Sequence, residues 1–406
     1  MTGKSDSYDV IVVGAGPVGS QVAYKLADKG YNVVVLERKE NLNGVVCCTG
    51  LVSWECVDEF SIPEEVIYRW VNSAQLIPPS GKPLQIWRDV PQVAVLNRSA
   101  FNDLWAKRAR KAGAEYLFDI DVRAIERGRK KTKVIAFSHG EMMTLQGRVV
   151  VVTTGFGAHL LGGLGLGGVG DFVMGVQAEV ETKGVDEVEV HFGNEIVPAF
   201  FAWLVPTLPG KALVGLLSRY NTPSYLRKFL ASLVTTGKVQ SADVKFTYGG
   251  MPLKPLPHTH SDKLLVVGTA AGQVKPITGG GIYFGLICAD IAANTLHRAL
   301  EADNLSAAGL SGYERAWRRK LGRELTTGYW ARRIYEMLGD RQVDRVFKLL
   351  ESSGMIEELR QAEELTFDWH ADIIARVTGR KLFAKAFGSV KKPFNLKTVP
   401  SPARKQ

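Results

Sequence analysis

The 406-residue sequence predicts an α/β fold that contains an inserted β-rich domain and ends in helices. Two apolar, β-branched runs, residues 9–13 and 263–267, are typical of buried parallel strands, and each leads into a glycine-rich turn and a helical pattern. Between them, residues 171–180 and 198–206 have the composition of further strands. A chain of this length usually forms two or three domains, so a strand-rich insertion is expected.

The first apolar run leads into a turn suited to a dinucleotide. Gly14, Gly16 and Gly19 have G-x-G-x-x-G spacing and open a predicted helix. Gly14 allows the tight turn, Gly16 lets the backbone approach a pyrophosphate, and Gly19 lets the helix pack closely on the strand. The next predicted strand, residues 31–36, is followed by Glu37, which can accept hydrogen bonds from a ribose. An acid there favours FAD or NAD over NADP, but the spacing alone does not separate FAD from NAD.

A second glycine triplet has the same spacing in a different context. Gly165, Gly167 and Gly170 follow no predicted strand, and residues 171–180 have the pattern of a strand rather than a helix. The triplet therefore predicts a loop and not a second dinucleotide fold.

The second apolar run is followed by GTAAGQVKPITGGG, residues 268–281, and a helix is predicted from Ile282 to about Leu300. This segment resembles the second FAD motif of the group that includes aromatic hydroxylases and geranylgeranyl reductases, which implies that it holds the ribityl chain and the flavin ring. Three glycines before a helix leave N–H groups free to face the pyrimidine edge of the flavin, which becomes anionic on reduction. Thr269 stands where that family has Asp, so it can bond a ribityl hydroxyl but brings no charge.

Three further segments extend the resemblance to roughly residues 7–330. Residues 97–104 (NRSAFNDL) are similar to a family segment whose arginine, here Arg98, lies near the FAD, and the predicted strand at 149–155 ends close to the flavin. Residues 44–53 (GVVCCTGLVS) resemble the segment beside the isoalloxazine ring of geranylgeranyl reductases. A thiol there can donate a proton or form a redox pair, and a buried inert cysteine is the alternative.

Residues 198–206 (PAFFAWLVP) are similar to the P-x-x-Y-x-W-x-F-P signature of geranylgeranyl reductases. Phe201 replaces the tyrosine and Val205 the second phenylalanine, which makes the segment more apolar. On a strand Phe201 and Trp203 point to the same face and would offer two aromatic walls near the flavin. Flavin-dependent halogenases carry a related signature, and an ordinary core strand is the other alternative.

The resemblance implies the following cofactor-binding and catalytic residues. The cofactor set is Gly14, Gly16, Pro17, Gly19, Glu37, Arg38, Cys47, Thr49, Gly50, Arg98, Val122, Thr154, Gly155, Gly268, Thr269, Gly272, Pro276, Gly279, Gly280, Gly281 and Ile282. The catalytic set is Cys48, Phe201 and Trp203. No metal site is predicted, because the four cysteines lack zinc-ligand spacing.

The predicted architecture is an FAD-binding Rossmann-type domain, aromatic-hydroxylase-like, with an inserted β-rich substrate domain and a helical C-terminal region. The expected boundaries are residues 1–60, 95–165 and 255–300 for the FAD domain, 61–94 and 166–254 for the substrate domain, 301–375 for the helical region, and 376–406 for a basic tail.

The favoured function is an FAD-dependent reductase that saturates carbon–carbon double bonds of an isoprenoid chain or related lipid. An isolated alkene must gain a proton and a hydride, and apolar walls tolerate the resulting cation and exclude water. The electron donor is NAD(P)H or a ferredoxin-type protein. A flavin-dependent monooxygenase or halogenase is one alternative, and a weakly flavinylated lipid-binding protein is another.

The net charge of +10 is concentrated in the tail. Residues 376–406 hold nine basic residues and no acid, which leaves 42 basic and 41 acidic residues elsewhere. With no secretory signal and no apolar run long enough to span a bilayer, the protein is expected to be cytoplasmic. The tail is expected to bind an anionic membrane surface, with a solvated chain end as the alternative. No nucleic-acid partner is expected.

Overall fold

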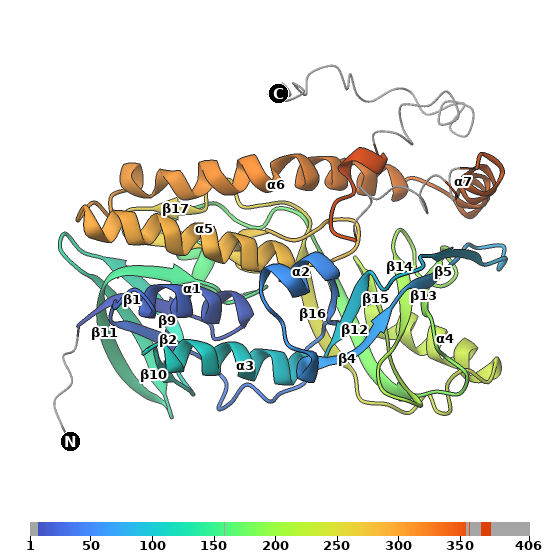
Figure 1. The fold of residues 1–406 in the computed structure, drawn as a ribbon, viewed down its shortest axis with the longest axis horizontal. Coiled ribbons are helices and arrows are strands. Elements are labelled where there is room, and N and C mark those ends of the chain that lie inside the picture. The colour runs from blue at the N-terminus through green and yellow to red at the C-terminus, as the bar shows by residue number, and fades with distance from the viewer. Residues whose placement is uncertain (1–6, 158, 355–356, 358–366, 375–406) are drawn as a thin grey trace, which may run out of the picture.

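The computed structural model describes residues 7–157, 159–354, 357 and 367–374, so the predicted basic tail lies outside the described residues. The molecule has two lobes, each built on a β-sheet, and helices α5 (Ile282–Glu301) and α6 (Ala307–Tyr335) lie over them (Figure 1). Helix α6 runs along the first lobe and reaches the second. The architecture is the mixed α/β fold that the sequence predicts.

The first lobe contains an eight-stranded sheet with the strand order β17-β18-β11-β1-β2-β8, to which β10 and β9 add an antiparallel extension. Strand β1 pairs in parallel with β11 and β2. The bounds are β1 Ser7–Val13, β2 Val33–Leu36, β8 Glu115–Leu117, β9 Asp121–Arg127, β10 Thr132–Ser138, β11 Glu141–Val152, β17 His260–Ser261 and β18 Leu264–Val266.

Both faces of this sheet are covered, which explains the continuous apolar composition of β1. Val10 and Val12 belong to the core cluster that contains α1 (Pro17–Ala27), α3 (Arg98–Lys111) and α5. Ile11 and Val13 belong to the opposite cluster, with strand β10 and the short helix η2 (His159–Gly163). The side chains of successive residues alternate between the two faces, as strand geometry requires.

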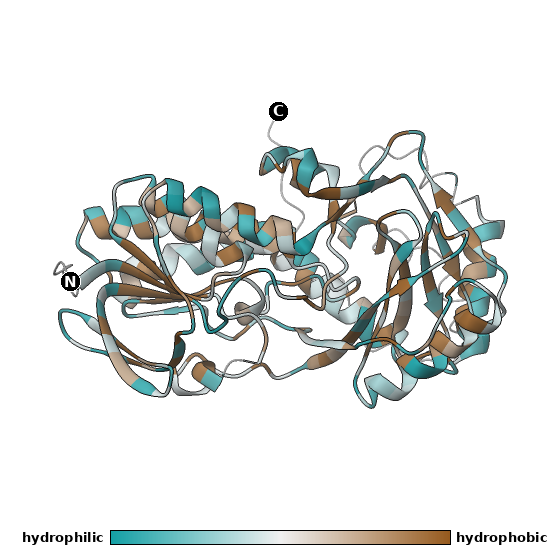
Figure 2. Cartoon of the chain, turned by 90° about the horizontal axis from the view of Figure 1, so that it is seen from below, coloured by the Kyte–Doolittle hydropathy of each residue, from teal (hydrophilic) through white to brown (hydrophobic). Residues whose placement is uncertain are grey.

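The second lobe contains a seven-stranded sheet with the order β16-β12-β15-β14-β13-β5-β6. Helix α4 (Thr222–Thr235) covers one face of it, where the Phe229 ring lies 4.8 Å from that of His191. Figure 2 shows that hydrophobic colouring follows the strands inside both lobes. The bounds are β5 Ser73–Ile77, β6 Leu84–Trp87, β12 Phe172–Glu181, β13 Val188–Phe192, β14 Phe201–Pro206, β15 Lys211–Ser218 and β16 Thr247–Pro252.

A three-stranded sheet, β3-β7-β4, completes the β-structure of the described residues. Its strands are β3 Leu51–Ser53, β4 Ile67–Val71 and β7 Val93–Leu96. The remaining elements are α2 Trp54–Glu59, α7 Asp340–Ser352, η1 Glu64–Val66 and η3 Gly268–Ala271.

The loop expected at 165–170 is present, and several strands are shorter than expected. Strand β2 begins at Val33 rather than at residue 31, β11 ends at Val152 rather than at residue 155, and β18 spans Leu264–Val266 within the expected 263–267. The glycine triplet at 165–170 lies between η2 and strand β12 and opens no helix. The strand expected at 198–206 begins only at Phe201, because Ala199 has a positive φ of 61° that ends the extended conformation. The parallel pairing of β5 with β13 joins the two sequence stretches assigned to the substrate domain. The division into domains stays a prediction.

Candidate functional site

The first glycine turn joins β1 to α1 in a conformation that only glycine tolerates at two positions. Gly14 has a φ of 108°, and a Cβ there would lie 2.7 Å from the carbonyl oxygen of Thr153. A Cβ at Gly19 would overlap the carbonyl oxygen of Gly14. At Gly16, by contrast, a Cβ would have no other atom within 4 Å. Gly16 therefore faces open space at the start of α1, where no side chain caps the helix and its N–H groups stay available.

Glu37 stands at the edge of this turn with its carboxylate fixed by the backbone. Its Oε2 accepts a hydrogen bond from Ala15 N at 2.9 Å, and its Oε1 accepts one from Lys39 N at 3.1 Å. A carboxylate has further lone pairs that can accept from the hydroxyls of a ribose. The neighbouring Arg38 is exposed, and Val122 is half-buried on β9, two residues after Ile120, whose N–H donates to the Glu37 carbonyl. The structure thus brings the residues expected at the adenosine end together.

Arg98, the first residue of α3, has buried guanidinium N–H groups that find no hydrogen-bond acceptor in the described part of the chain. Its Nη2 donates to Asn102 Oδ1 at 3.1 Å, whereas Nε and Nη1 are buried and have no hydrogen-bond partner among the described residues. Gly50 lies close by in the fold, because its backbone pairs with that of Leu96. Buried donors are normally satisfied, so these two nitrogens indicate a missing acceptor.

The second glycine turn begins beside the first. A Cβ at Gly268 would lie 3.1 Å from the Val18 side chain of α1. Hydrogen bonds from Lys275 N to Gly280 O at 3.0 Å and from Gly279 N to Lys275 O at 2.9 Å close the loop. Gly281 caps α5 without a side-chain acceptor, so the N–H groups of this helix end also face outward.

The polar side chains around this loop resemble Arg98 in lacking partners. Thr269 Oγ1 lies 3.5 Å from the position of a Cβ at Gly281. The buried hydroxyls of Thr278 and of Thr154, which follows β11, have no hydrogen-bond partner among the described residues. Gly155 has open space around it, whereas a Cβ at Gly272 would overlap the Lys254 carbonyl. An open space at Gly16, two free helix ends and several orphaned polar atoms fit a long ligand with a phosphate group and a polar ring, as FAD is.

The aromatic pair of β14 lies on the face of the second sheet that α4 does not cover. Trp203 is paired with Gly215, where a Cβ would lie 2.5 Å from the indole. The Phe201 and Trp203 ring centroids are 6.1 Å apart, and Trp203 Nε1 is buried with no hydrogen-bond partner in the described part of the chain. Leu217, two residues after Gly215, shares this face.

This face of the second sheet meets the cofactor segments of the first lobe. A Cβ at Gly279 would lie 3.1 Å from Met251 Sδ and 3.4 Å from Leu217 Cδ1. On the neighbouring strands, a Cβ at Gly249 would lie 3.2 Å from Cys47 Cβ, and Gln177 Nε2 donates to Cys48 O at 3.4 Å. Two of the segments predicted to surround a flavin, 268–281 and 44–53, therefore meet the face of the sheet that carries the predicted aromatic walls.

The two cysteines of this segment are free thiols, and both are half-buried. Burial, together with the neighbouring Cys48, raises the pKa of the Cys47 thiol to about 12. Cys47 therefore stays protonated at neutral pH and can hold a proton at the junction between the lobes. The role assigned to Cys48 stays a prediction.

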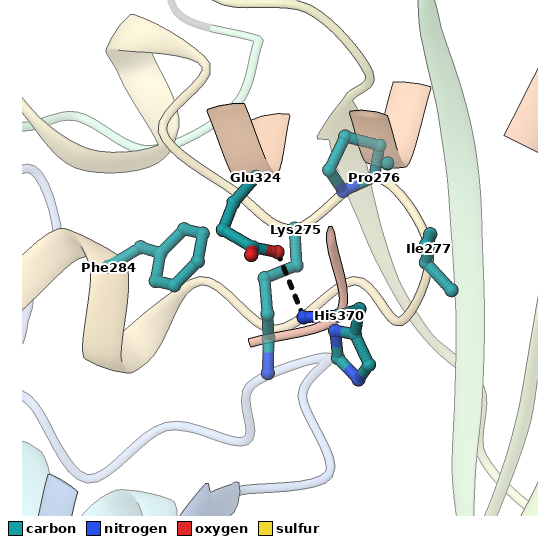
Figure 3. A pocket seen from close by; sticks show the side chains of 7 residues that line it. Lys275, Pro276, Ile277, Phe284, Glu324 and His370 are labelled. Atoms are coloured by element: carbon teal, nitrogen blue, oxygen red, sulfur yellow. Dashed lines mark hydrogen bonds between the residues drawn. The ribbon is translucent and has the colours of Figure 1, made fainter. Parts of the chain in front are cut away.

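A buried ion pair, which no sequence pattern predicted, lies behind the second glycine turn. Lys275 and Asp368 contact each other and are 4% and 2% exposed. Figure 3 shows Lys275, Pro276 and Ile277 lining a small pocket with Phe284, Glu324 and His370. Glu324 accepts the backbone N–H of His370 at 2.9 Å and so fixes the segment 367–374 to helix α6. A local sequence pattern cannot predict the pair of Lys275 and Asp368, because these residues lie 93 positions apart.

The chain is similar to known proteins over most of its length. A family model described as lycopene cyclase protein matches residues 9–345. A digeranylgeranylglycerophospholipid reductase of Methanocaldococcus jannaschii is 31% identical over 365 residues, which cover 86% of this chain and 92% of that protein.

Solved structures show the same fold at lower identity. A geranylgeranyl bacteriochlorophyll reductase-like protein of Thermoplasma acidophilum has a TM-score of 0.82 at 23% identity, covering 94% of this chain and 98% of its own. A halogenase in complex with FAD has a TM-score of 0.64 at 15% identity, covering 95% of this chain and 87% of its own.

Proposed function

The chain belongs to the lycopene cyclase and geranylgeranyl reductase-like family of FAD-dependent oxidoreductases, and from this premise we propose that it saturates the isoprenoid chains of a digeranylgeranylglycerophospholipid. The resemblance drawn from the sequence motifs is confirmed by the family match. We propose this particular substrate because a relative that is 31% identical, and of which this chain covers 92%, is named digeranylgeranylglycerophospholipid reductase.

One observation supports this proposal more than any other. The face of the second sheet that α4 leaves uncovered carries Trp203 and Leu217, and Leu217 meets the Gly279 turn, which is the segment expected to face the flavin ring. An apolar chain bound along this face would lie next to that ring. A polar substrate would have few partners there, because most residues of the face near this turn are aromatic, aliphatic or glycine and the polar Gln177 already donates to Cys48 O.

The residues of the first lobe would hold FAD along two helix ends. The open space at Gly16 would accommodate the pyrophosphate, Glu37 would accept from the ribose, and Arg98, whose Nε and Nη1 lack partners among the described residues, would donate to polar groups of the cofactor. The N-terminus of α5 favours negative charge at the flavin pyrimidine edge. When bound, FAD supplies the hydride that the alkene requires.

The residues of the second lobe would bind and orient the lipid. Phe201 and Trp203 exclude water from the alkene and are compatible with positive charge on it, because aromatic faces attract cations. The alkene also needs a proton, and Cys48, the predicted catalytic thiol, is the candidate donor. The physiological electron donor stays a prediction.

The proposal is tested by incubating the flavin-loaded protein, reduced with dithionite under nitrogen, with digeranylgeranylglycerophospholipid. We expect products that have gained one pair of hydrogens for each double bond saturated, detected by mass spectrometry. A product that contains oxygen after aerobic incubation, with no saturated lipid, would indicate a monooxygenase instead.

A further inference from the structure

Helix α6 carries a buried guanidinium whose ion pair with Glu336 leaves two of its nitrogens without a hydrogen bond among the described residues. Arg332 is 4% exposed, and its Nε and Nη2 have no hydrogen-bond partner among the described residues. The nearest carboxylate oxygen, Glu336 Oε1, is 3.7 Å from Nε, too far for a hydrogen bond. The guanidinium carbon lies 3.0 Å from the centroid of the Phe200 ring. Burial lowers the pKa of Arg332 to about 9, which still leaves it charged at neutral pH.

The carboxylates around Arg332 are already bound by other groups. Glu336 accepts two hydrogen bonds from Arg219 Nη2, at 2.8 and 3.1 Å, and one from Arg333 Nη1 at 2.6 Å. Asp171 accepts from Arg219 Nη1 at 2.7 Å and from the Tyr329 hydroxyl at 3.0 Å. Three arginines thus share two carboxylates, and Arg332 is the one whose Nε and Nη2 hydrogen-bond to neither of them. Buried donors are normally satisfied, so these two nitrogens suggest an anion that binds during function.

Arg332 lies next to the candidate site. Gly328, one helical turn earlier on the same face of α6, packs on the second glycine turn, where a Cβ would lie 3.2 Å from Pro276 Cδ. On the other side, the Phe200 ring under Arg332 is 6.3 Å from that of Phe201. The guanidinium therefore stands between the turn expected to hold the flavin and the aromatic wall expected to hold the lipid.

The two unpaired nitrogens define the chemistry of the missing anion. Nε–H and the adjacent Nη2–H point outward from one edge of the planar guanidinium, and this edge binds carboxylates and phosphates through two parallel hydrogen bonds. A lipid that is apolar along its chains and carries a phosphate at its glycerol end would match both the aromatic face and this edge.

We propose that Arg332 binds the phosphate group of the lipid substrate through Nε and Nη2 and so orients the isoprenoid chains toward the second glycine turn. This inference rests on the proposed function, because it assigns the headgroup position for that same substrate. Arg219 and Arg333 hold Glu336 away from the guanidinium edge and keep it available for the phosphate.

The test compares two lipids with the dithionite-reduced, flavin-loaded protein: digeranylgeranylglycerol phosphate and digeranylgeranylglycerol without phosphate. The wild type should have a KM at least about tenfold lower for the phosphorylated lipid, as expected for charge-assisted hydrogen bonds. Arg332→Met should raise that KM about tenfold or more and leave the KM for the uncharged lipid and the flavin content unchanged. Arg315→Gln, which removes the same charge at an exposed position of the same helix away from Glu336, should retain the preference.

Further measurements separate the outcomes. Arg332→Met should unfold at the wild-type temperature or above, because an apolar residue replaces a buried charge whose hydrogen bonds are incomplete. Arg332→Lys, which keeps the charge but loses the two-donor edge, should have an intermediate KM for the phosphorylated lipid.

If the wild type reduces neither lipid, the proposed function fails. If it reduces both without preference, or if Arg332→Met keeps the preference, the headgroup site is wrong. Competition by inorganic phosphate at the concentration of the lipid would also overturn it, since the site would then serve a free anion.

Discussion

Gly16 and Gly19 belong to the same turn, but the structure assigns them different tasks. A Cβ at Gly19 would overlap the Gly14 carbonyl oxygen, whereas Gly16 faces open space and has a φ of −64° that any residue can adopt. We therefore expect Gly16→Val to fold but to purify without flavin, and Gly19→Val to fail to fold. Flavin absorbance and thermal unfolding measure the two effects separately. A yellow Gly16→Val protein with full flavin content would contradict the assignment of the pyrophosphate position.

Thr269 provides a second test at the scale of one residue. The threonine is half-buried beside Gly281, where the N-terminus of α5 favours a negative charge. Thr269→Asp, which restores the residue of the resembled family, should retain FAD binding, measured as a dissociation constant by fluorescence titration. Loss of flavin in this variant, while Thr269→Ser retains it, would show that the motif has been aligned to the wrong group.

The residues that the sequence could predict differ physically from those it could not. The glycines of both turns are set by local geometry, so their spacing identified them. Arg332 appears in the sequence as one of several arginines in a helix. Its unsatisfied nitrogens depend on Phe200 and on Arg219, both from other segments, as well as on its helix neighbours Tyr329 and Arg333. Long-range packing of that kind leaves no periodic signal.

Strand β14 is the element that we propose to bind the substrate. Its pattern predicted that Phe201 and Trp203 share a face, and pairing with Gly215 explains how the indole fits flat against β15. The pattern could not predict which lobe that face meets, because the contact of Gly279 with Met251 and Leu217 depends on how two sheets dock.

Trp203 tests the role of this strand. Trp203→Ala should lose turnover of the long prenyl lipid while retaining FAD, at a cost of about 3–5 kcal/mol in the free energy of unfolding. Trp203→Phe should be closer to wild type in stability, since Trp203 Nε1 has no partner to lose. Steady-state kinetics of both variants measure the effect, and wild-type kinetics in Trp203→Ala would place the residue in the ordinary core.

The free energy of unfolding should depend on pH because of His370, which lies in the segment 367–374 beside the second glycine turn. Burial, with the nearby Lys275, lowers the pKa of His370 from 6.5 to about 4. The unfolded chain therefore binds more protons than the folded one between these values, so the free energy of unfolding should fall as the pH falls from about 6.5 to about 4, by about 3 kcal/mol. Urea unfolding across this range should show the loss in wild type and a smaller one in His370→Asn. An identical pH dependence in the two proteins would exclude His370 as its source.

At the scale of the whole molecule, a lipid reductase must reach its substrate in a membrane. Within the described residues no helix combines the length and apolar composition needed to cross a bilayer. The tail at 376–406 lies outside those residues, and its nine basic side chains predict electrostatic attachment worth about 1 kcal/mol for each one near an anionic surface. Full-length protein should co-sediment with anionic vesicles at low salt and less at high salt. A chain cut after residue 375 should stay in solution; equal sedimentation of both forms would show that the tail is a solvated end.

In the proposed function, electrons pass from the flavin to an isoprenoid double bond at the junction of the two lobes. Stopped-flow absorbance of the flavin tests this step after the reduced holoprotein is mixed with digeranylgeranylglycerophospholipid without oxygen. We expect the oxidised flavin spectrum to return with the unsaturated lipid, not to return with the fully saturated lipid, and to return more slowly in Trp203→Ala. A reduced flavin that is reoxidised by oxygen alone, and never by the unsaturated lipid, would show that electrons do not pass to the double bond.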